Sequence, residues 1–415
     1  MDKSEIRQVI LEQKETFERV DKIVPRNVSR TILDSPKIVA ITGVRRCGKS
    51  TLLKQLAKNY KLYNYINFED ERLLEFTFKD FNTVLESFLE LNPNVKTFFF
   101  DEIQNITGWE RFVRRLFTDG YKIFVTGSNA KLLSSEIATS LTGRNLKLGL
   151  YPFSFKEYLL FCEFPIKDAY TTKEKAELAK HLQDYVKYGG FPEVIKTKDY
   201  QELNELYQDI IIKDLIARLK IRDAKDFREL ALYLISNTSK KISYNNLKNM
   251  LGFSSTSKVK NYIDFLSEAY LLFTVNKYDP SIKKQLINDR KVYAIDQGII
   301  NAMAFQFSQN LGRLMENIVF LALKRRNANI YYFEGKNECD IVIKEGLKIT
   351  RAIQVTESLA DPGVKLREIN GLMEAVNKFN LKEGMIITMD SEVQLLKDGI
   401  KIMVVPLWKW LLQDN

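Results

Sequence analysis

A glycine-rich stretch early in the chain has the residue types and the spacing needed to hold a polyphosphate. Residues 43–51 read Gly-Val-Arg-Arg-Cys-Gly-Lys-Ser-Thr and match the pattern G-x-x-x-x-G-K-[ST]. Glycines let backbone N–H groups turn inward around phosphate oxygens, and the N-terminus of a following helix adds partial positive charge. Lys49 would reach the β- and γ-phosphates of a nucleotide, and the Ser50 hydroxyl would ligate Mg²⁺.

Two adjacent acids follow an apolar run about fifty residues downstream. Phe98, Phe99 and Phe100 precede Asp101 and Glu102, as in a buried strand that ends in a metal-binding acid and a water-activating acid. Asp101 would hold Mg²⁺ with Ser50, and Glu102 would orient and polarise the attacking water. The predicted nucleotide-binding residues are Gly43, Val44, Arg45, Arg46, Cys47, Gly48, Lys49, Ser50, Thr51 and Asp101.

The elements around these residues alternate between strand and helix. Short runs rich in β-branched and aromatic residues occur at 37–42, 62–68, 97–100 and 122–126, and helix-period stretches separate them. This order predicts an α/β domain with a parallel sheet. The last run ends in Gly-Ser-Asn, where Asn129 could position water near the γ-phosphate; the alternative is that Ser128 and Asn129 cap the next helix.

Composition limits the class of protein. The 415 residues suffice for two to four domains, and 45% hydrophobic with 28% charged residues is typical of a globular protein. Three distant cysteines and the single His181 exclude a local CxxC zinc site, a His-rich metal site and a Ser-His-Asp triad. With no apolar run of roughly 18 residues and no secretory signal in MDKSEIRQ, we expect a cytoplasmic protein without a membrane partner.

Several of these segments together resemble a known family. GVRRCGKST after Thr42, then FFFDE, VTGSN, LTGRNLKL and YPFSFKEYL, are similar to the prokaryotic AAA-type ATPases that carry a C-terminal domain of the PD-(D/E)XK nuclease-like class. The resemblance covers nearly the whole chain. It implies ATP and Mg²⁺ as cofactors, with an ATPase core at 1–151, a helical lid at 152–204, a winged-helix domain at 205–298 and a nuclease-like α/β domain at 299–415.

The resemblance also assigns two further residues of the ATPase site. Asn129 matches the sensor-1 position, and Arg144 matches an arginine finger that a neighbouring subunit would receive. Such a finger neutralises charge on the transferred phosphoryl group and is worth roughly 10³–10⁵ in rate. A finger acting in trans requires a homo-oligomer. The alternatives are that Arg144 pairs with a surface carboxylate, or that Arg114 or Arg115 takes this role.

A basic segment between Lys240 and Arg290 is the candidate DNA-binding surface. It holds nine basic and four acidic residues, half of the chain's net charge of +10. Leucines before Gly252 and the apolar face of 254–270 predict a helix-turn-helix. Its second helix would present Ser257, Lys258, Lys260 and Asn261 to phosphates. The alternative is a module that only packs against other domains or subunits.

The C-terminal segment resembles the nuclease-like core but lacks part of its chemistry. Glu316 on a helix and Asp340 on a strand occupy two acidic positions, whereas Gln354 and Thr356 stand where a second acid and a lysine are expected. Gln offers a neutral oxygen, but Thr supplies no positive charge. Lys348 or Lys365 could substitute from a nearby position. We therefore expect a degenerate, binding-only domain.

Three functions remain open from the sequence. The first is an oligomeric Mg²⁺-dependent ATP hydrolase with Lys49, Glu102, Asn129 and Arg144 as catalytic residues, which couples turnover to DNA binding or remodelling. The second is a nucleotide-dependent signalling or defence switch with slow hydrolysis. The third is an ATP-regulated DNA nuclease.

Overall fold

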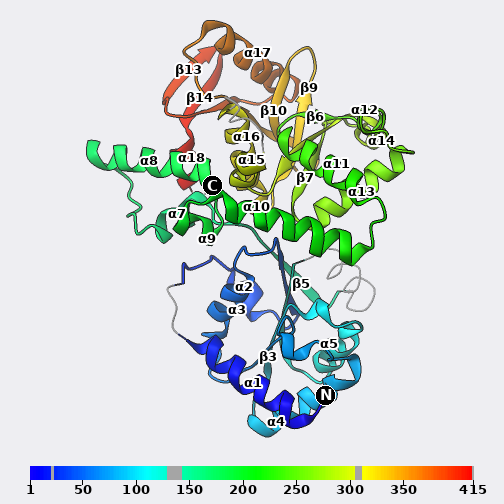
Figure 1. The fold of residues 1–415 in the computed structure, drawn as a ribbon. Coiled ribbons are helices and arrows are strands. Elements are labelled where there is room, and N and C mark those ends of the chain that lie inside the picture. The colour runs from blue at the N-terminus through cyan, green and yellow to red at the C-terminus, as the bar shows by residue number, and fades with distance from the viewer. Residues whose placement is uncertain (20–22, 129–142, 304–310, 414–415) are drawn as a thin grey trace. The chain divides into compact units, whose positions relative to one another are not determined.

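The computed structural model describes residues 1–19, 23–128, 143–303 and 311–413, which form two compact units, Met1–Tyr151 and Pro152–Asn415 (Figure 1). The segments assigned above to a lid, a winged helix and a nuclease-like domain all lie within the second unit. Over these ranges, no helix combines the length and the apolar character that crossing a bilayer requires.

The first unit is built on a five-stranded parallel sheet, as the alternation of strand and helix predicted. Its spatial order is β2-β3-β4-β1-β5, and every neighbouring pair is parallel. The strands are β1 (Ile38–Gly43), β2 (Asn64–Asn67), β3 (Thr97–Asp101), β4 (Lys122–Gly127) and β5 (Asn145–Leu150). The first four match the apolar runs in the sequence, because both faces of a parallel sheet are buried under helices.

Helices cover both faces of this sheet. Alternate residues of the strands pack in one core with α1, α4 and α5, and α3 lies against β1, β3 and β4. The helices of the unit are α1 (Lys3–Glu18), α2 (Arg30–Asp34), α3 (Lys49–Ala57), α4 (Phe81–Leu91) and α5 (Trp109–Thr118). In α5 the buried residues Trp109, Phe112, Val113 and Leu116 recur at helical spacing, which fixes the face turned to the sheet.

The second unit begins with helices and a small antiparallel sheet. Capping boxes start α7 and α8, where Ser154 pairs with Glu157 and Thr171 with Glu174. The helices are α7 (Phe155–Phe161), α8 (Thr172–Tyr188), α9 (Pro192–Thr197), α10 (Tyr200–Asp209), the π-helix Ile210–Ala217, α11 (Ala224–Ser236), α12 (Tyr244–Leu251), α13 (Thr256–Glu268), α14 (Ile282–Ile287) and α15 (Gln297–Met303). The sheet, in the order β6-β8-β7, consists of β6 (Lys241–Ile242), β7 (Leu272–Asn276) and β8 (Arg290–Ala294).

The rest of the second unit is a six-stranded mixed sheet in the order β13-β14-β12-β11-β10-β9. Its strands are β9 (Asn329–Glu334), β10 (Glu338–Glu345), β11 (Lys348–Val355), β12 (Glu383–Thr388), β13 (Val393–Lys397) and β14 (Ile400–Pro406). The accompanying helices are α16 (Leu311–Arg325), α17 (Pro362–Lys378) and α18 (Leu407–Leu412). Residues of α17 share one apolar core with β10, β11, β12 and β14.

A buried carboxylate joins the helical part of this unit to the segment after β8. Asp296 is 1% exposed and accepts hydrogen bonds at 2.8 Å from the backbone N–H groups of Gly190 and Gly298. Gly189 has φ +82°, and a Cβ there would lie 1.9 Å from Asp296 Oδ1. Gly189 is therefore needed for close approach to Asp296 as well as for its positive φ, and Gly190 is needed because a Cβ there would lie 2.3 Å from the Phe153 carbonyl oxygen.

Candidate functional site

The loop between β1 and α3 has the backbone shape needed to surround phosphates. Gly48 adopts φ +97°, and Lys49 is the first residue of α3, so the N-terminus of that helix opens into the loop. Gly43 ends β1, where a Cβ would approach the Leu150 carbonyl oxygen to 2.2 Å. Both motif glycines are thus required by geometry, one by its positive φ and the other by contact with β5.

Lys49 lies inside this loop with its ammonium already paired. Its side chain is 4% exposed, and Nζ lies 3.2 Å from Glu102 Oε1 and 3.4 Å from each of the carbonyl oxygens of Gly43 and Val44. Burial by itself lowers the pKa of Lys49, but the neighbouring Glu102 outweighs it and the pKa is raised. The ammonium therefore stays charged at the place where phosphate oxygens would enter.

Asp101 lies at the end of β3 and is fully buried among hydroxyl groups. Thr126 on β4 hydrogen-bonds to Asp101 Oδ1, the Tyr65 hydroxyl donates to Oδ2 at 3.2 Å, and Ser50 also hydrogen-bonds to the carboxylate. Burial and the nearby Glu102 raise the pKa of Asp101. A carboxylate in contact with the Ser50 hydroxyl is a donor set that suits Mg²⁺, which takes one or two protein oxygens and completes its shell with phosphates and water.

Glu102 is held in a strained conformation beside Asp101. It has φ 47° and ψ 40°, a left-handed conformation that costs a non-glycine residue of order 1 kcal/mol or more. Its N–H donates to Thr126 Oγ1 at 2.9 Å, and the Gln104 amide donates to its carboxylate. Burial by itself raises the pKa of Glu102, but the Lys49 ammonium and the Gln104 amide outweigh it and lower the pKa.

The structure therefore brings the two acids predicted from the sequence to the phosphate loop. The convergence follows from the parallel sheet, since β1, β3 and β4 end at the same edge. Thr126 binds both Asp101 and the backbone of Glu102. The sequence reasoning overlooked it in favour of the residues that follow β4, although a threonine at the end of a buried strand is a detectable signal.

Arg26 is a second residue that the sequence analysis missed. Its guanidinium Nη2 donates to the Cys47 carbonyl at 3.0 Å and to the Tyr151 carbonyl at 3.2 Å. Gln55 on α3 fixes the Arg26 backbone by two hydrogen bonds, at 2.9 and 2.8 Å. Arg26 thus braces the phosphate loop from outside, and no motif marks it because its partners are backbone carbonyls.

We expect Arg26→Met to weaken nucleotide binding by about tenfold, because the charged guanidinium loses its hydrogen bonds to the Cys47 carbonyl of the loop and to the Tyr151 carbonyl after β5. Arg26→Lys keeps the charge but not the planar guanidinium, and it should lose part of this affinity. The dissociation constant of a fluorescent nucleotide analogue measures the effect. Arg30→Met, at an exposed position of α2, is the matched control; equal affinities for it and Arg26→Met would contradict the bracing role.

The remaining predicted residues of the first unit have varied positions. Arg45 pairs with Glu69 at 3.1 Å, and Arg46 is exposed. Cys47 is buried with its Sγ 3.6 Å from the Leu150 carbonyl, as befits a small packing residue. Arg144 is exposed, and its carbonyl accepts from the Ile38 N–H at 2.9 Å. Asn129 lies outside the described residues.

The predicted DNA-contact residues lie at the start of α13. Ser257, Lys260 and Asn261 are exposed. Lys258 instead pairs with Asp223 at 2.7 Å and lies over the rings of Phe253 and Tyr262. Lys258 is therefore a packing and ion-pair residue in this structure, and the other three remain available to a phosphate backbone.

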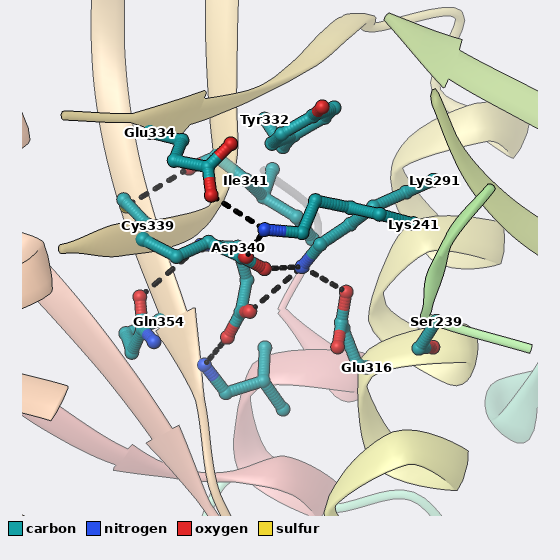
Figure 2. Close-up of polar contacts among 12 residues, drawn as sticks. Ser239, Lys241, Lys291, Glu316, Tyr332, Glu334, Cys339, Asp340, Ile341 and Gln354 are labelled. Carbon is teal, nitrogen blue, oxygen red and sulfur yellow. Dashed lines mark hydrogen bonds and ion pairs between the residues drawn. The ribbon is translucent and has the colours of Figure 1, made fainter. Parts of the chain in front are cut away.

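The C-terminal sheet gathers Glu316 and Asp340 around a lysine that the sequence analysis did not consider. Lys291 of β8 lies between the two acids, as Figure 2 shows. Gln354 and Thr356 are buried close to the same strands, whereas Lys348 and Lys365 are exposed. In this structure the cation beside Glu316 and Asp340 is Lys291, from a strand distant in sequence, and not one of the two lysines left open as substitutes.

Comparisons with known proteins identify an AAA domain in the first part of the chain. Residues 35–159 match a family model described as an AAA domain, and residues 179–310 match a domain of unknown function, DUF8612. A Haemophilus influenzae protein titled only as uncharacterized is 28% identical over 92% of this chain and 95% of its own. The Aeropyrum pernix ORC2 protein in its ADP form aligns with 63% of this chain and 90% of its own at 13% identity, and the TM-score of 0.34 is too low to support an argument.

The alignment with one relative covers almost all of this chain and almost all of the relative. The uncharacterized protein MJ1544 of Methanocaldococcus jannaschii is 39% identical over 98% of this chain and 94% of its own. In this chain the phosphate loop and the paired acids lie on a five-stranded parallel sheet, within the segment that matches the AAA domain. The chain therefore belongs to the same family as MJ1544, and it contains a P-loop AAA domain at residues 35–159.

Proposed function

We propose that this protein is a Mg²⁺-dependent ATP hydrolase that acts as a homo-oligomer and couples ATP turnover to DNA. The observation that carries the ATPase assignment is the buried pair Lys49–Glu102, 3.2 Å apart, beside the Asp101 carboxylate and Ser50. These groups are the cation, the general base and the Mg²⁺ ligands that phosphoryl transfer to water requires.

The pairing of Lys49 with Glu102 suggests how binding prepares the site. A triphosphate in the loop competes for the Lys49 ammonium, so the lysine turns from Glu102 to the β- and γ-phosphate oxygens. Glu102 then loses the charge that lowers its pKa and becomes a stronger base for the attacking water. Mg²⁺ bound near Ser50 and Asp101 would neutralise charge on the phosphates. Nucleotide binding thus frees Glu102 from Lys49, so that Glu102 can act as the catalytic base.

Support for a DNA role comes from the charge and the exposed groups of the segment 240–290. The element order from α11 to β8, with strands β6, β7 and β8 in one antiparallel sheet, is compatible with a winged helix. Lys260 is exposed at the start of α13, where a helix enters a DNA groove in such modules. DNA would bind such a surface through contacts to its phosphates, and the affinity of such binding falls as the salt concentration rises.

Phosphate release with and without duplex or branched DNA tests this coupling. We expect DNA to stimulate turnover, and Lys260→Ala to weaken DNA binding and to reduce the salt slope of affinity by about one. Lys173→Ala, at an exposed position of α8, is the matched control. Mass measurement with an ATP analogue reports the oligomer.

The same experiment separates the second candidate, a nucleotide-dependent switch. The self-paired state of Lys49 and Glu102 also suits a protein that rests without nucleotide. Slow turnover that DNA does not change, together with different assemblies in ATP and ADP, would replace the DNA-coupled function by the switch.

A further inference from the structure

A buried lysine stands at the centre of the acidic cluster in the C-terminal sheet. Lys291 is 2% exposed at its side chain, and its Nζ lies 2.9 Å from Glu316 Oε1, 2.6 Å from Glu338 Oε1 and 2.9 Å from Asp340 Oδ1 (Figure 2). Burial by itself lowers the pKa of Lys291, but Asp340 and Glu316 outweigh it and raise the pKa well above its ordinary value. The ammonium is therefore a positive charge held by the carboxyl groups of Glu316, Glu338 and Asp340. Burial and the nearby Asp340 raise the pKa of Glu316 to about 8.

These carboxyl groups have hydrogen-bond and ion-pair partners besides Lys291. The Tyr293 hydroxyl donates to Glu316 Oε1 at 2.7 Å, and the Val355 N–H donates to Asp340 Oδ2 at 3.0 Å. Lys241 of β6 lies 3.1 Å from Glu338 Oε2. The cluster is thus internally satisfied, as a buried polar network must be to avoid a large desolvation cost.

Gln354 stands where the nuclease-like class has its second acid on a strand, and both ends of its amide are hydrogen-bonded. Its amide nitrogen donates to Glu368 Oε2 at 2.5 Å, and its amide oxygen accepts from the Asp340 N–H at 3.1 Å. Thr356 carries no charge. Within the parts of the chain that the structure describes, no three His, Cys, Asp or Glu residues form a group suited to a metal ion.

The nuclease-like class implies a divalent metal between these acids, and the residues present do not fit one. The point where the carboxylates of Glu316 and Asp340 converge is taken by an ammonium group at hydrogen-bonding distance. A divalent ion there would have to displace a buried lysine whose strand, β8, pairs with β6 and β7 on either side. Repulsion between the two cations opposes joint occupancy.

We propose that Lys291 is the resident cation of this cluster, so that the C-terminal sheet binds no divalent metal through Glu316 and Asp340 and does not cleave DNA. The lysine also fastens β8 to the six-stranded sheet. Two further contacts join the same sheets: Lys277 forms a β-bridge with Tyr332, and the Tyr332 side-chain hydroxyl donates to the Asp289 carbonyl at 2.7 Å. The role of Glu316, Glu338 and Asp340 is then structural: by pairing with Lys291 they hold the three-stranded sheet against the six-stranded sheet.

Metal binding to the full chain without nucleotide tests the proposal, because the phosphate-loop site then lacks its phosphates. The probe is Mn²⁺, followed by electron paramagnetic resonance. Wild type and the control Lys277→Met should bind no Mn²⁺ in the C-terminal unit, whereas Lys291→Met should gain one site, at least about tenfold tighter than any site of wild type. Lys291→Met with Asp340→Asn should lose it again.

Thermal melting gives a second readout that does not depend on activity. Lys291→Met should lower Tm by roughly 6–15 °C, because it leaves buried carboxylates without their cation, and Mn²⁺ should restore part of the loss. A folded Lys291→Met that gains no Mn²⁺ overturns the proposal. If this variant does not fold, wild type decides: Mn²⁺ binding or DNA cleavage that Asp340→Asn abolishes overturns it, and the absence of both supports it.

Discussion

Glu102→Gln is expected to bind ATP at least as tightly as wild type and to hydrolyse it about 10²–10⁴-fold more slowly. Glutamine keeps the size of the side chain but cannot accept a proton from the attacking water, and general-base catalysis contributes a factor of this order. Binding is preserved because the amide holds the Lys49 ammonium less strongly than the carboxylate 3.2 Å away. Single-turnover hydrolysis and the affinity for a fluorescent nucleotide analogue measure the two effects separately.

Glu86→Gln provides the matched control for this variant. Glu86 is an exposed carboxylate on α4 that pairs with Lys3 at 3.2 Å, and we expect turnover there to stay within about twofold of wild type, since surface ion pairs contribute little. Unchanged hydrolysis in Glu102→Gln would show that another group activates the water. Loss of binding in the same variant would show that Glu102 contacts the nucleotide directly.

Lys49→Ala is expected to lose nucleotide binding by about a hundredfold or more, and steady-state turnover with it. The variant removes the ammonium that contacts the Gly43 and Val44 carbonyls and Glu102, and charge-assisted hydrogen bonds to phosphate are among the strongest in proteins. Lys58→Ala, at the exposed end of α3, should bind nucleotide like wild type. Equal binding by Lys49→Ala and Lys58→Ala would refute the phosphate-loop assignment.

A double variant separates the loss of phosphate binding from a loss of stability. Lys49→Ala leaves Glu102 buried without its cation, which should lower the free energy of unfolding by roughly 3 kcal/mol. Lys49→Ala with Glu102→Gln removes both charges and should recover most of this stability while nucleotide binding stays weak. Chemical denaturation of the four proteins in the cycle measures the coupling.

The two clusters of the protein use lysine in opposite ways. Lys49 pairs with one carboxylate and two carbonyls. It lies in the first turn of α3 next to the exposed Ser50, so an incoming phosphate can compete with Glu102 for the ammonium. Lys291 is enclosed by three carboxylates and is 2% exposed. We therefore expect the Lys49 ammonium to bind phosphate when a nucleotide enters, and the Lys291 ammonium to stay paired with its neighbouring acids.

Much of the nucleotide site could be predicted because its parts are local in sequence. The glycines, Lys49 and Ser50 belong to one continuous loop, and the acids follow a run of three phenylalanines. Backbone geometry then places them, since parallel strands end at a common edge. Arg26 and Tyr65 could not be recognised, because Arg26 donates to two backbone carbonyls and Tyr65 to a carboxylate, all distant in sequence.

The residue types of this chain alone determined a phosphate loop, a pair of acids and an alternation of strands and helices that forces a parallel sheet. Tertiary structure decided which charges meet. Lys291 lies 25 residues from Glu316 and 49 from Asp340 along the chain, and only the packing of β8 against α16 and β10 brings the three together. Electrostatic pairing depends on distance in space and on burial, neither of which a sequence motif records for residues on separate strands.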